Sequence, residues 1–289
     1  MRSQPGTSSV IRIGIIGCGY WGPNLVRNFS KLRECKVAAV ADLEPAKLET
    51  IARLYPAVET TTSAQDLLAH TGIDAIVVTT PISTHYKLAS EALQKGKHVF
   101  VEKPMTATVA EADRLVELAD RVQRVLMVDH TFIYSGAVRT IKHLIDAGEI
   151  GEISYYDSVR VNLGLFQHDV NVLWDLGPHD FSIMAYLLTG KPTSVSAVGA
   201  KLVRSETWGL ESLVYVTIEV SPGILAHFHL NWLSPVKIRR TLIGGARKMI
   251  VYDHLDPDNQ VKIFDKGVEI RTDTERYQML VQYRAGGGR

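Results

Sequence analysis

The chain has 289 residues, 46% of them apolar, and its 32 basic residues nearly balance its 31 acidic ones. That length predicts about two domains, with enough chain to bury a core without disulfide support. The charge balance argues against a nucleic-acid partner, because non-specific nucleic-acid binding needs a basic excess. No apolar run approaches the ~20 residues of a membrane helix, and residues 1–10 lack the apolar segment of a signal peptide. Two cysteines, Cys18 and Cys35, are too few for a disulfide framework, so we expect a cytoplasmic protein without a membrane partner.

Residues 10–130 alternate between strand and helix patterns, after a tail over residues 1–9 that we expect to be flexible. Short apolar runs predict strands at 11–17, 36–42, 73–80, 98–101 and 125–128. Helical spacing predicts helices at 21–33, 84–95 and 109–121, with a further one that starts near Pro45. Strands that are apolar on both faces need helices on both sides. This half therefore predicts an α/β domain with a doubly wound parallel sheet.

Residues 131–289 show a second pattern, typical of an α+β domain. Apolar and polar side chains alternate with period two over 152–163, 212–220 and 223–233. This alternation predicts a mostly antiparallel sheet with one packed face. Helical spacing predicts helices at 135–146 and 178–188, with Pro178 in the first turn of the second helix.

A glycine-rich turn follows the first predicted strand, where Gly17-Cys18-Gly19-Tyr20-Trp21-Gly22 has the spacing G-x-G-x-x-G. Between a strand and a helix, this spacing is typical of a Rossmann dinucleotide-binding turn, whose backbone approaches a pyrophosphate at the helix N-terminus. Asp42 follows 20 residues after Gly22, at the end of the second strand. A carboxylate there accepts hydrogen bonds from a ribose 2′-hydroxyl and repels a 2′-phosphate, which predicts NAD rather than NADP. The alternative is a glycine turn with an ordinary surface aspartate.

Ligands of such sheets bind at the carboxyl ends of the strands, so the residues after each strand are candidates. Thr80 and Pro81 follow one strand, and His85 begins the next helix, where it borders the cofactor or has a capping or surface role. Glu102-Lys103-Pro104 follows the next strand and predicts an amine held at the site, although a surface ion pair explains this fragment equally well. We also predict that the Lys103–Pro104 bond is cis.

In the second half, Asp175, His179 and Asp180 lie close together in an otherwise apolar stretch. Asp175 and His179 are four residues apart, so the carboxylate can orient the imidazole if that turn is helical. Histidine, with an unperturbed pKa of about 6.5, can serve as both acid and base. A histidine near a helix start is more often structural, but the two flanking acids favour a catalytic interpretation here.

The glycine turn, the Glu102-Lys103-Pro104 tripeptide and the Asp175-x-x-x-His179 pattern resemble one family over nearly the whole chain, the glucose-fructose oxidoreductase / inositol dehydrogenase / rhizopine-catabolism (Gfo/Idh/MocA) oxidoreductases. Residues 162–180 look like the branch that acts on nucleotide-linked and amino sugars. The resemblance implies an NAD(P)-dependent oxidoreductase acting on a secondary alcohol or ketone of a sugar, nucleotide sugar or cyclitol. It also implies a Rossmann domain plus a large open sheet, through which copies pair into a homo-oligomer, a dimer or tetramer.

The same resemblance implies roles for individual residues. Lys103 matches the family's catalytic lysine, which polarises the reacting oxygen, and Asp175 and His179 match its second-domain catalytic pair. His179 is then the acid/base, oriented by Asp175. The residues predicted to bind the cofactor are Gly17, Gly19, Tyr20, Trp21, Gly22, Asp42, Thr80, Pro81, His85, Glu102 and Lys103.

Substrate contacts are predicted for Lys103, Asp175 and His179 and for four further residues, which are Tyr134, Arg160, Asn162 and His168. Alternation puts Arg160 and Asn162 on one strand face, which suits a phosphate or a sugar hydroxyl; a solvated sheet face is the alternative. Core packing is the alternative for Tyr134. His227 and His229 also share a strand face, but without a third ligand they predict no metal site.

Relatives in this family commonly continue beyond a strand near 261–264 with a further helix and a closing strand. Residues 268–289 show no counterpart and end on a glycine-rich tail, so we expect the second domain to be truncated at its C-terminus. Two other functions fit the same scaffold. A dinucleotide-sensing regulator or scaffold needs only the glycine turn, and the presence of Lys103, Asp175 and His179 argues against it. An imine, dihydrodiol or biliverdin-type reductase tends to lack the Asp-x-x-x-His pair.

Overall fold

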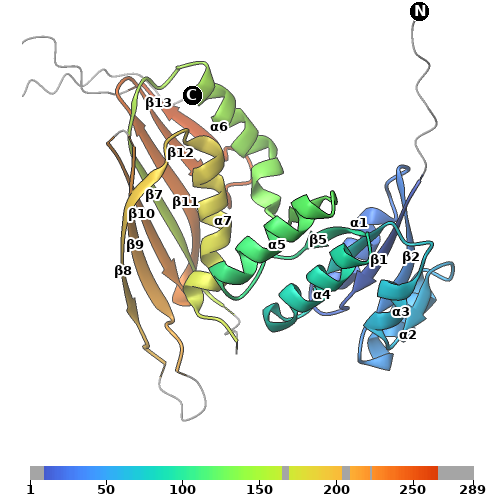
Figure 1. Cartoon of the computed structure of the whole chain (residues 1–289). Coiled ribbons are helices and arrows are strands. Elements are labelled where there is room, and N and C mark those ends of the chain that lie inside the picture. The colour runs from blue at the N-terminus through green and yellow to red at the C-terminus, as the bar shows by residue number, and fades with distance from the viewer. Residues whose placement is uncertain (1–9, 165–168, 204–208, 222, 266–289) are drawn as a thin grey trace, which may run out of the picture. The chain divides into compact units, whose positions relative to one another are not determined.

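The computed structural model describes residues 10–164, 169–203, 209–221 and 223–265. The chain divides into two compact units, Met1–Asp129 and His130–Arg289, which are blue to green and green to red in Figure 1. The predicted N-terminal tail, His168 and the C-terminal segment from residue 266 lie outside the described residues.

The first unit contains a six-stranded parallel sheet in the order β3-β2-β1-β4-β5-β6, as its apolar strands predict. Its strands are β1 (Ile11–Ile16), β2 (Cys35–Ala41), β3 (Glu59–Thr61), β4 (Ala75–Val78), β5 (His98–Val101) and β6 (Leu126–Val128). Its helices are α1 (Gly22–Phe29), α2 (Pro45–Leu54), α3 (Ala64–Ala69), α4 (Ile82–Gln94) and α5 (Val109–Arg121). The sequence pattern left out β3 and α3, because both are too short to show a clear period.

Successive residues of β1 enter two different apolar clusters of this unit. Ile15 packs in a cluster with Leu25 of α1 and Ile51 of α2. Ile16 packs in another cluster with Leu93 of α4 and Leu115 of α5. Because neighbouring side chains of a strand point to opposite faces, the two clusters lie on opposite faces of the sheet. The doubly wound α/β arrangement is confirmed.

The second unit contains a seven-stranded sheet in the order β13-β12-β11-β7-β10-β9-β8. Its strands are β7 (Ile153–Leu163), β8 (Pro192–Ala200), β9 (Leu213–Val220), β10 (Ile224–Asn231), β11 (Leu233–Gly245), β12 (Met249–Asp253) and β13 (Val261–Phe264). All neighbours are antiparallel except β7 and β10, so the mostly antiparallel prediction is confirmed. The 3-10 helix η1 (Thr131–Tyr134) precedes α6 (Gly136–Asp146), and α6 and α7 (Val172–Leu187) lie along one face of the sheet (Figure 1).

Helix α7 begins earlier than the sequence pattern predicts. It starts at Val172 rather than at 178, because Asn171 caps it: the Asn171 Oδ1 accepts a hydrogen bond from the Trp174 N–H at 3.1 Å. Pro178 therefore lies inside the helix and not in its first turn, which corrects the prediction. At 16 residues α7 is the longest helix of the described chain, and no helix there is long and apolar enough to cross a membrane.

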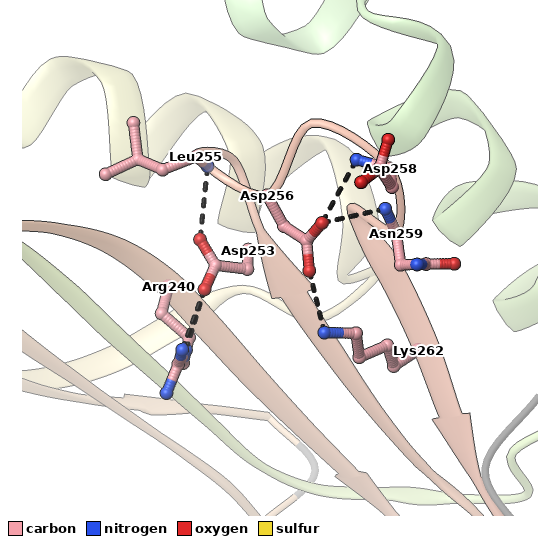
Figure 2. A network of polar contacts seen from close by, with 7 residues as sticks. All are labelled: Arg240, Asp253, Leu255, Asp256, Asp258, Asn259 and Lys262. Atoms are coloured by element: carbon pink, nitrogen blue, oxygen red, sulfur yellow. Dashed lines mark hydrogen bonds and ion pairs between the residues drawn. The ribbon is translucent and has the colours of Figure 1, made fainter.

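The turn between β12 and β13 is held by carboxylates (Figure 2). Asp256 accepts hydrogen bonds from the backbone N–H groups of Asp258 and Asn259, at 3.1 and 2.9 Å, and its other oxygen lies 2.7 Å from Lys262 Nζ. These contacts, led by the one with Lys262, lower the pKa of Asp256 to about 2. Asp253 pairs with Arg240 on the neighbouring strand at 2.7 Å. The turn is thus ordered by local hydrogen bonds, which a carboxylate accepts without side-chain packing.

Candidate active site

The glycine turn after β1 requires glycine at two positions and leaves open space at the third. Gly17 has φ +106°, and a Cβ there would lie 2.8 Å from the Thr79 backbone. A Cβ on Gly22 would overlap the carbonyl oxygen of Gly17. A Cβ on Gly19 would meet nothing within 4 Å. Gly17 therefore allows the turn to pack against the backbone that follows β4, and Gly22 allows α1 to start directly on the turn. The backbone at Gly19 stays accessible, as a bound pyrophosphate requires.

Asp42, directly after β2, is tied to that turn. Its Oδ2 accepts a hydrogen bond from the Cys18 N–H at 2.5 Å, and its Oδ1 accepts one from the Glu44 N–H at 2.9 Å. Lys47 Nζ lies 4.0 Å from the same carboxylate. Burial, with Asp42 as the second cause, raises the pKa of the Cys18 thiol to about 11, so the thiol stays neutral. The acid and the glycine turn occupy adjacent places in the fold, and together they fit the pyrophosphate and ribose of a dinucleotide.

Tyr20 and Trp21 project from the turn into solvent. Tyr20 is 79% exposed, and its ring meets that of Trp21 edge-on at 5.4 Å. Large exposed aromatic side chains are available for contact with a planar ligand. Their contact with the cofactor stays a prediction.

His85 is a buried connector between two of the loops at the carboxyl edge of the sheet. It is 2% exposed, its Nε2 lies 2.8 Å from the Thr80 carbonyl oxygen, and its Nδ1 lies 2.9 Å from that of Pro104. The ring thereby links the segment after β4 to the segment after β5, in which the Lys103–Pro104 bond is cis, as predicted. We find His85 in the fold beneath these loops, and its direct contact with a cofactor stays a prediction.

Glu102 and Lys103 follow β5. Glu102 is buried, and its Oε2 accepts a hydrogen bond from the Lys103 N–H at 3.1 Å. Burial, followed by the neighbouring carboxylate of Asp129 after β6, raises the pKa of Glu102 to about 8. Two carboxyl groups therefore interact beside Lys103 at this edge of the sheet, and their proximity favours the neutral form of Glu102.

Asp175 and His179 lie on successive turns of α7, in the second unit. The buried indole of Trp232, which is 1% exposed, donates a hydrogen bond from its Nε1 to Asp175 Oδ2 at 3.1 Å. The ring of Phe132, in η1, meets the His179 imidazole edge-on with 4.8 Å between the centroids. The helix keeps the two predicted catalytic residues on one face, and side chains from β10–β11 and η1 fix their surroundings.

Arg160 and Asp180 form a buried ion pair beneath α7, each side chain being 4% exposed. Arg160 Nε lies 2.5 Å from Asp180 Oδ2, and Ser158 Oγ donates to Asp180 Oδ1 at 3.0 Å. The Arg160 guanidinium also lies 4.8 Å above the Phe132 ring. Arg160 thus faces α7 with a partner from the same unit, and its predicted substrate contact stays a prediction.

The other predicted substrate residues are placed differently. Tyr134 is half exposed and lies 5.7 Å from the Arg139 guanidinium. Asn162 is partly exposed near the end of β7, and His168 lies outside the described residues. Lys103 belongs to the first unit, whereas Asp175 and His179 belong to the second.

Three residues of these surroundings were not predicted from the sequence. Trp232 holds Asp175, Phe132 packs on His179, and Asp129 faces Glu102. Period-two alternation already put Trp232 on the packed face of its strand, where a buried indole N–H needs an acceptor. No comparable signal marks Phe132 or Asp129, whose neighbours are far away in the sequence.

Comparison with known proteins defines the class to which this fold and these residues belong. A family model described as "Oxidoreductase family, NAD-binding Rossmann fold" matches residues 11–130, and the "GFO/IDH/MocA C-terminal domain" matches residues 138–251. The protein is therefore an oxidoreductase with an NAD-binding Rossmann domain. It belongs to the Gfo/Idh/MocA family, as the three sequence motifs indicate.

Individual relatives agree with this assignment. The chain is 30% identical over 269 residues to the uncharacterized oxidoreductase YdgJ of Escherichia coli (88% of this chain, 74% of the relative). It is 27% identical over 271 residues to dTDP-3,4-didehydro-2,6-dideoxy-alpha-D-glucose 3-reductase of Saccharopolyspora spinosa (89% and 80%). Among solved structures, UDP-N-acetylglucosamine 3-dehydrogenase GnnA of Acidithiobacillus ferrooxidans matches with a TM-score of 0.78 and 25% identity (91% and 84%).

Proposed function

We propose that this oxidoreductase interconverts a secondary alcohol and a ketone on a sugar, nucleotide sugar or cyclitol, with NAD as its cofactor. The observation that carries the proposal is the joint presence of a dinucleotide turn in the first unit and an Asp175–His179 pair on α7 in the second. Nucleotide-sugar enzymes among the relatives support the substrate class. We assign cofactor binding to a domain over residues 10–130, and substrate binding and oligomerisation to a domain over residues 131–289.

The cofactor preference rests on Asp42. Residues Gly17, Gly19 and Gly22 would receive the pyrophosphate, and Asp42 would accept hydrogen bonds from the adenosine ribose. A 2′-phosphate would meet the same carboxylate and be repelled, although Lys47, 4.0 Å away, reduces that repulsion. When bound, NAD supplies a nicotinamide that accepts or donates a hydride at the substrate carbon.

Two side chains would act on the substrate oxygen, and a third would act through one of them. His179 would take the hydroxyl proton during oxidation and return it during reduction, because an imidazole is effective in both directions near neutral pH. Lys103 would stabilise the negative charge that develops on that oxygen. Asp175, held by the Trp232 indole, would favour the cationic form of His179.

The open face of the seven-stranded sheet would bind a second copy of the chain. Apolar and aromatic side chains on this face are exposed; they are Tyr155, Val198, Tyr215 and Leu225. The Tyr215 ring stacks on the His229 imidazole, with 4.6 Å between the centroids. Exposed apolar side chains on one sheet face favour burial against a partner.

We also propose that the enzyme is cytoplasmic, since both cysteines are free thiols.

The test is turnover of NAD or NADH with a panel of nucleotide sugars, aldoses and inositols. We expect Lys103→Ala and His179→Ala to lower kcat by about 10²–10⁴-fold on the preferred sugar. Lys95→Ala, which removes a surface lysine paired with Glu91, is the matched control and should keep full activity. Equal turnover in wild type and both site variants would refute the assignment. Tight NADH binding without any turnover would favour a sensor or scaffold instead.

A further inference from the structure

The second unit holds an arginine whose charge the rest of the structure does not explain. Arg239 on β11 is the direct antiparallel neighbour of Arg160 on β7. Like charges that face each other across strands destabilise a sheet, and more so where they are shielded from solvent. Asp180 forms hydrogen bonds to the Arg160 guanidinium, and it acts on Arg239 through its charge alone.

The Arg239 side chain makes no ion pair and no hydrogen bond with the described residues. Its Nε is buried without a hydrogen-bond acceptor in that part of the chain. Burial, followed by the charge of Arg160, lowers the pKa of Arg239. A buried guanidinium N–H without an acceptor is costly, and a site that keeps one is a candidate for binding an anion.

The surroundings of Arg239 contain a second guanidinium and an aromatic ring. Its guanidinium lies 6.0 Å from the centre of the Phe132 ring, whose other neighbours include Arg160 at 4.8 Å and His254 at 4.9 Å. Asp253, the carboxylate at the end of β12, accepts hydrogen bonds from Arg240 on the neighbouring strand β11 (Figure 2). Burial, followed by the charge of Arg239, lowers the pKa of His254, so its imidazole adds no charge. Two guanidinium groups at the Phe132 ring therefore have one buried carboxylate between them, that of Asp180.

This cluster adjoins the predicted acid/base, because the same Phe132 ring contacts His179 at 4.8 Å. We propose that Arg239 binds an oxyanion group of the substrate, a carboxylate or a phosphate. Arg160, opposite it in the sheet, would add positive charge, and the Phe132 ring contacts both guanidinium groups. A guanidinium fork matches the planar oxygen pair of either group. The inference rests on the proposed function and narrows it, since it selects sugars that carry a negative charge close to the reacting carbon.

A structural role and a binding role for Arg239 predict opposite results for stability. If Arg239 only supports the fold, Arg239→Gln should unfold at a lower temperature than wild type. If it is an anion site, the variant should be at least as stable without anion, because the repulsion from Arg160 is relieved. A residue that breaks a rule of local stability, as Arg239 does by facing another arginine, is commonly functional.

The first experiment measures thermal unfolding of the full chain, without NAD, in inorganic phosphate or D-glucuronate against chloride at equal ionic strength. We expect saturating amounts of at least one oxyanion to raise the midpoint of wild type by about 2–4 °C. Arg239→Gln should show no such rise, and Arg239→Lys should keep part of it. Arg240→Gln, the neighbouring arginine that pairs with Asp253, is the matched control and should respond like wild type.

Stabilisation by D-glucuronate would indicate a carboxylate site, and stabilisation by inorganic phosphate would indicate a phosphate site. An equal rise in wild type and Arg239→Gln, no rise with either probe, or a midpoint several degrees lower for Arg239→Gln in chloride would each overturn the proposal. This experiment needs no turnover, so it stands even if the proposed dehydrogenase activity is absent.

The second experiment compares KM and kcat for a charged and a neutral sugar. With a uronate or sugar phosphate as substrate, Arg239→Gln should raise KM by about tenfold to a hundredfold and leave kcat within about twofold. With myo-inositol both constants should be unchanged. An equal KM increase for charged and neutral substrates would overturn the anion site, whereas absence of turnover in wild type would count against the proposed function alone.

Discussion

The two sheets of this protein bury polar groups in different ways. In the first unit the sheet is parallel and covered on both faces, and its functional groups stand at the strand ends, where backbone and loops hold them. In the second unit one sheet face packs against helices, and charged side chains meet in that packed layer, as Arg160 of β7 does with Asp180 of α7. The candidate site groups of the first unit are thus held mainly by backbone geometry, and those of the second unit by buried side chains. Substitutions in the two units should therefore affect stability and ligand binding in different ways.

The largest expected effect lies in the glycine turn. Gly22→Ala would push a Cβ into the Gly17 carbonyl, so we expect NADH affinity to fall by about 100-fold or more and the first unit to lose stability. Gly19→Ala has room for its Cβ and should weaken NADH binding with little change in stability. Fluorescence titration with NADH and urea unfolding measure the two quantities. Unchanged NADH affinity in both variants would show that the turn does not bind the cofactor.

In the second unit, Asp180→Ala should cost about 3–5 kcal/mol of unfolding free energy, because it leaves the Arg160 guanidinium buried without its carboxylate. Asp253→Ala removes the carboxylate partner of the exposed Arg240 and should cost less than about 1 kcal/mol. Urea unfolding of both variants provides the comparison. If Asp180→Ala lowered the unfolding free energy no more than Asp253→Ala does, the buried Arg160–Asp180 pair would not be needed for stability.

Trp232→Phe should keep most of the ring's packing and remove the hydrogen bond to Asp175. We expect kcat to fall by about tenfold and the acidic limb of its pH profile to move, since a charged acceptor loses its donor. Phe228→Leu, a packing change on the same strand face, should lower stability without moving the pH profile. If both variants gave the same pH profile, the indole would be a packing residue only.

Smaller effects should appear as opposite pH dependences of the two units. Burial raises the pKa of Glu102 from 4.5 to about 8, so its folded form holds a proton that the unfolded chain releases, and stability falls as the pH rises between these values. Glu102→Gln should remove that decline. Chemical unfolding at pH 5, 7 and 9 gives the slope, and an unchanged slope in the variant would contradict the assigned cause.

Asp256 should behave in the opposite way. Its pKa is lowered to about 2 by Lys262 and two backbone N–H groups, so its contribution is present above the unfolded pKa and is lost as the pH falls through about 2. Asp256→Asn should therefore lower the melting temperature slightly at neutral pH and not at all near pH 2. A variant that is destabilised equally at both pH values would show that the turn depends on shape rather than on charge.

The sequence predicted the first unit more completely than the second. Strand and helix patterns, the glycine turn and the acid at Asp42 are local signals, and each lies where the fold requires it. The start of α7 was predicted wrongly because Pro178 was interpreted as a first-turn proline, whereas the capping side chain of Asn171 lies seven residues earlier. A proline is a strong local signal, and helix packing outweighed it here.

By itself, the sequence determined the family, the Rossmann unit with its dinucleotide turn, and the residues Lys103, Asp175 and His179 as catalytic candidates, because short spacings and strand ends carry that information. Only the tertiary structure decided that Trp232 holds Asp175, that Asp180 neutralises Arg160, and that Arg239 faces Arg160. These pairs join residues that are tens of positions apart. Their meeting depends on strand register and on which face is buried, and no local spacing records either one.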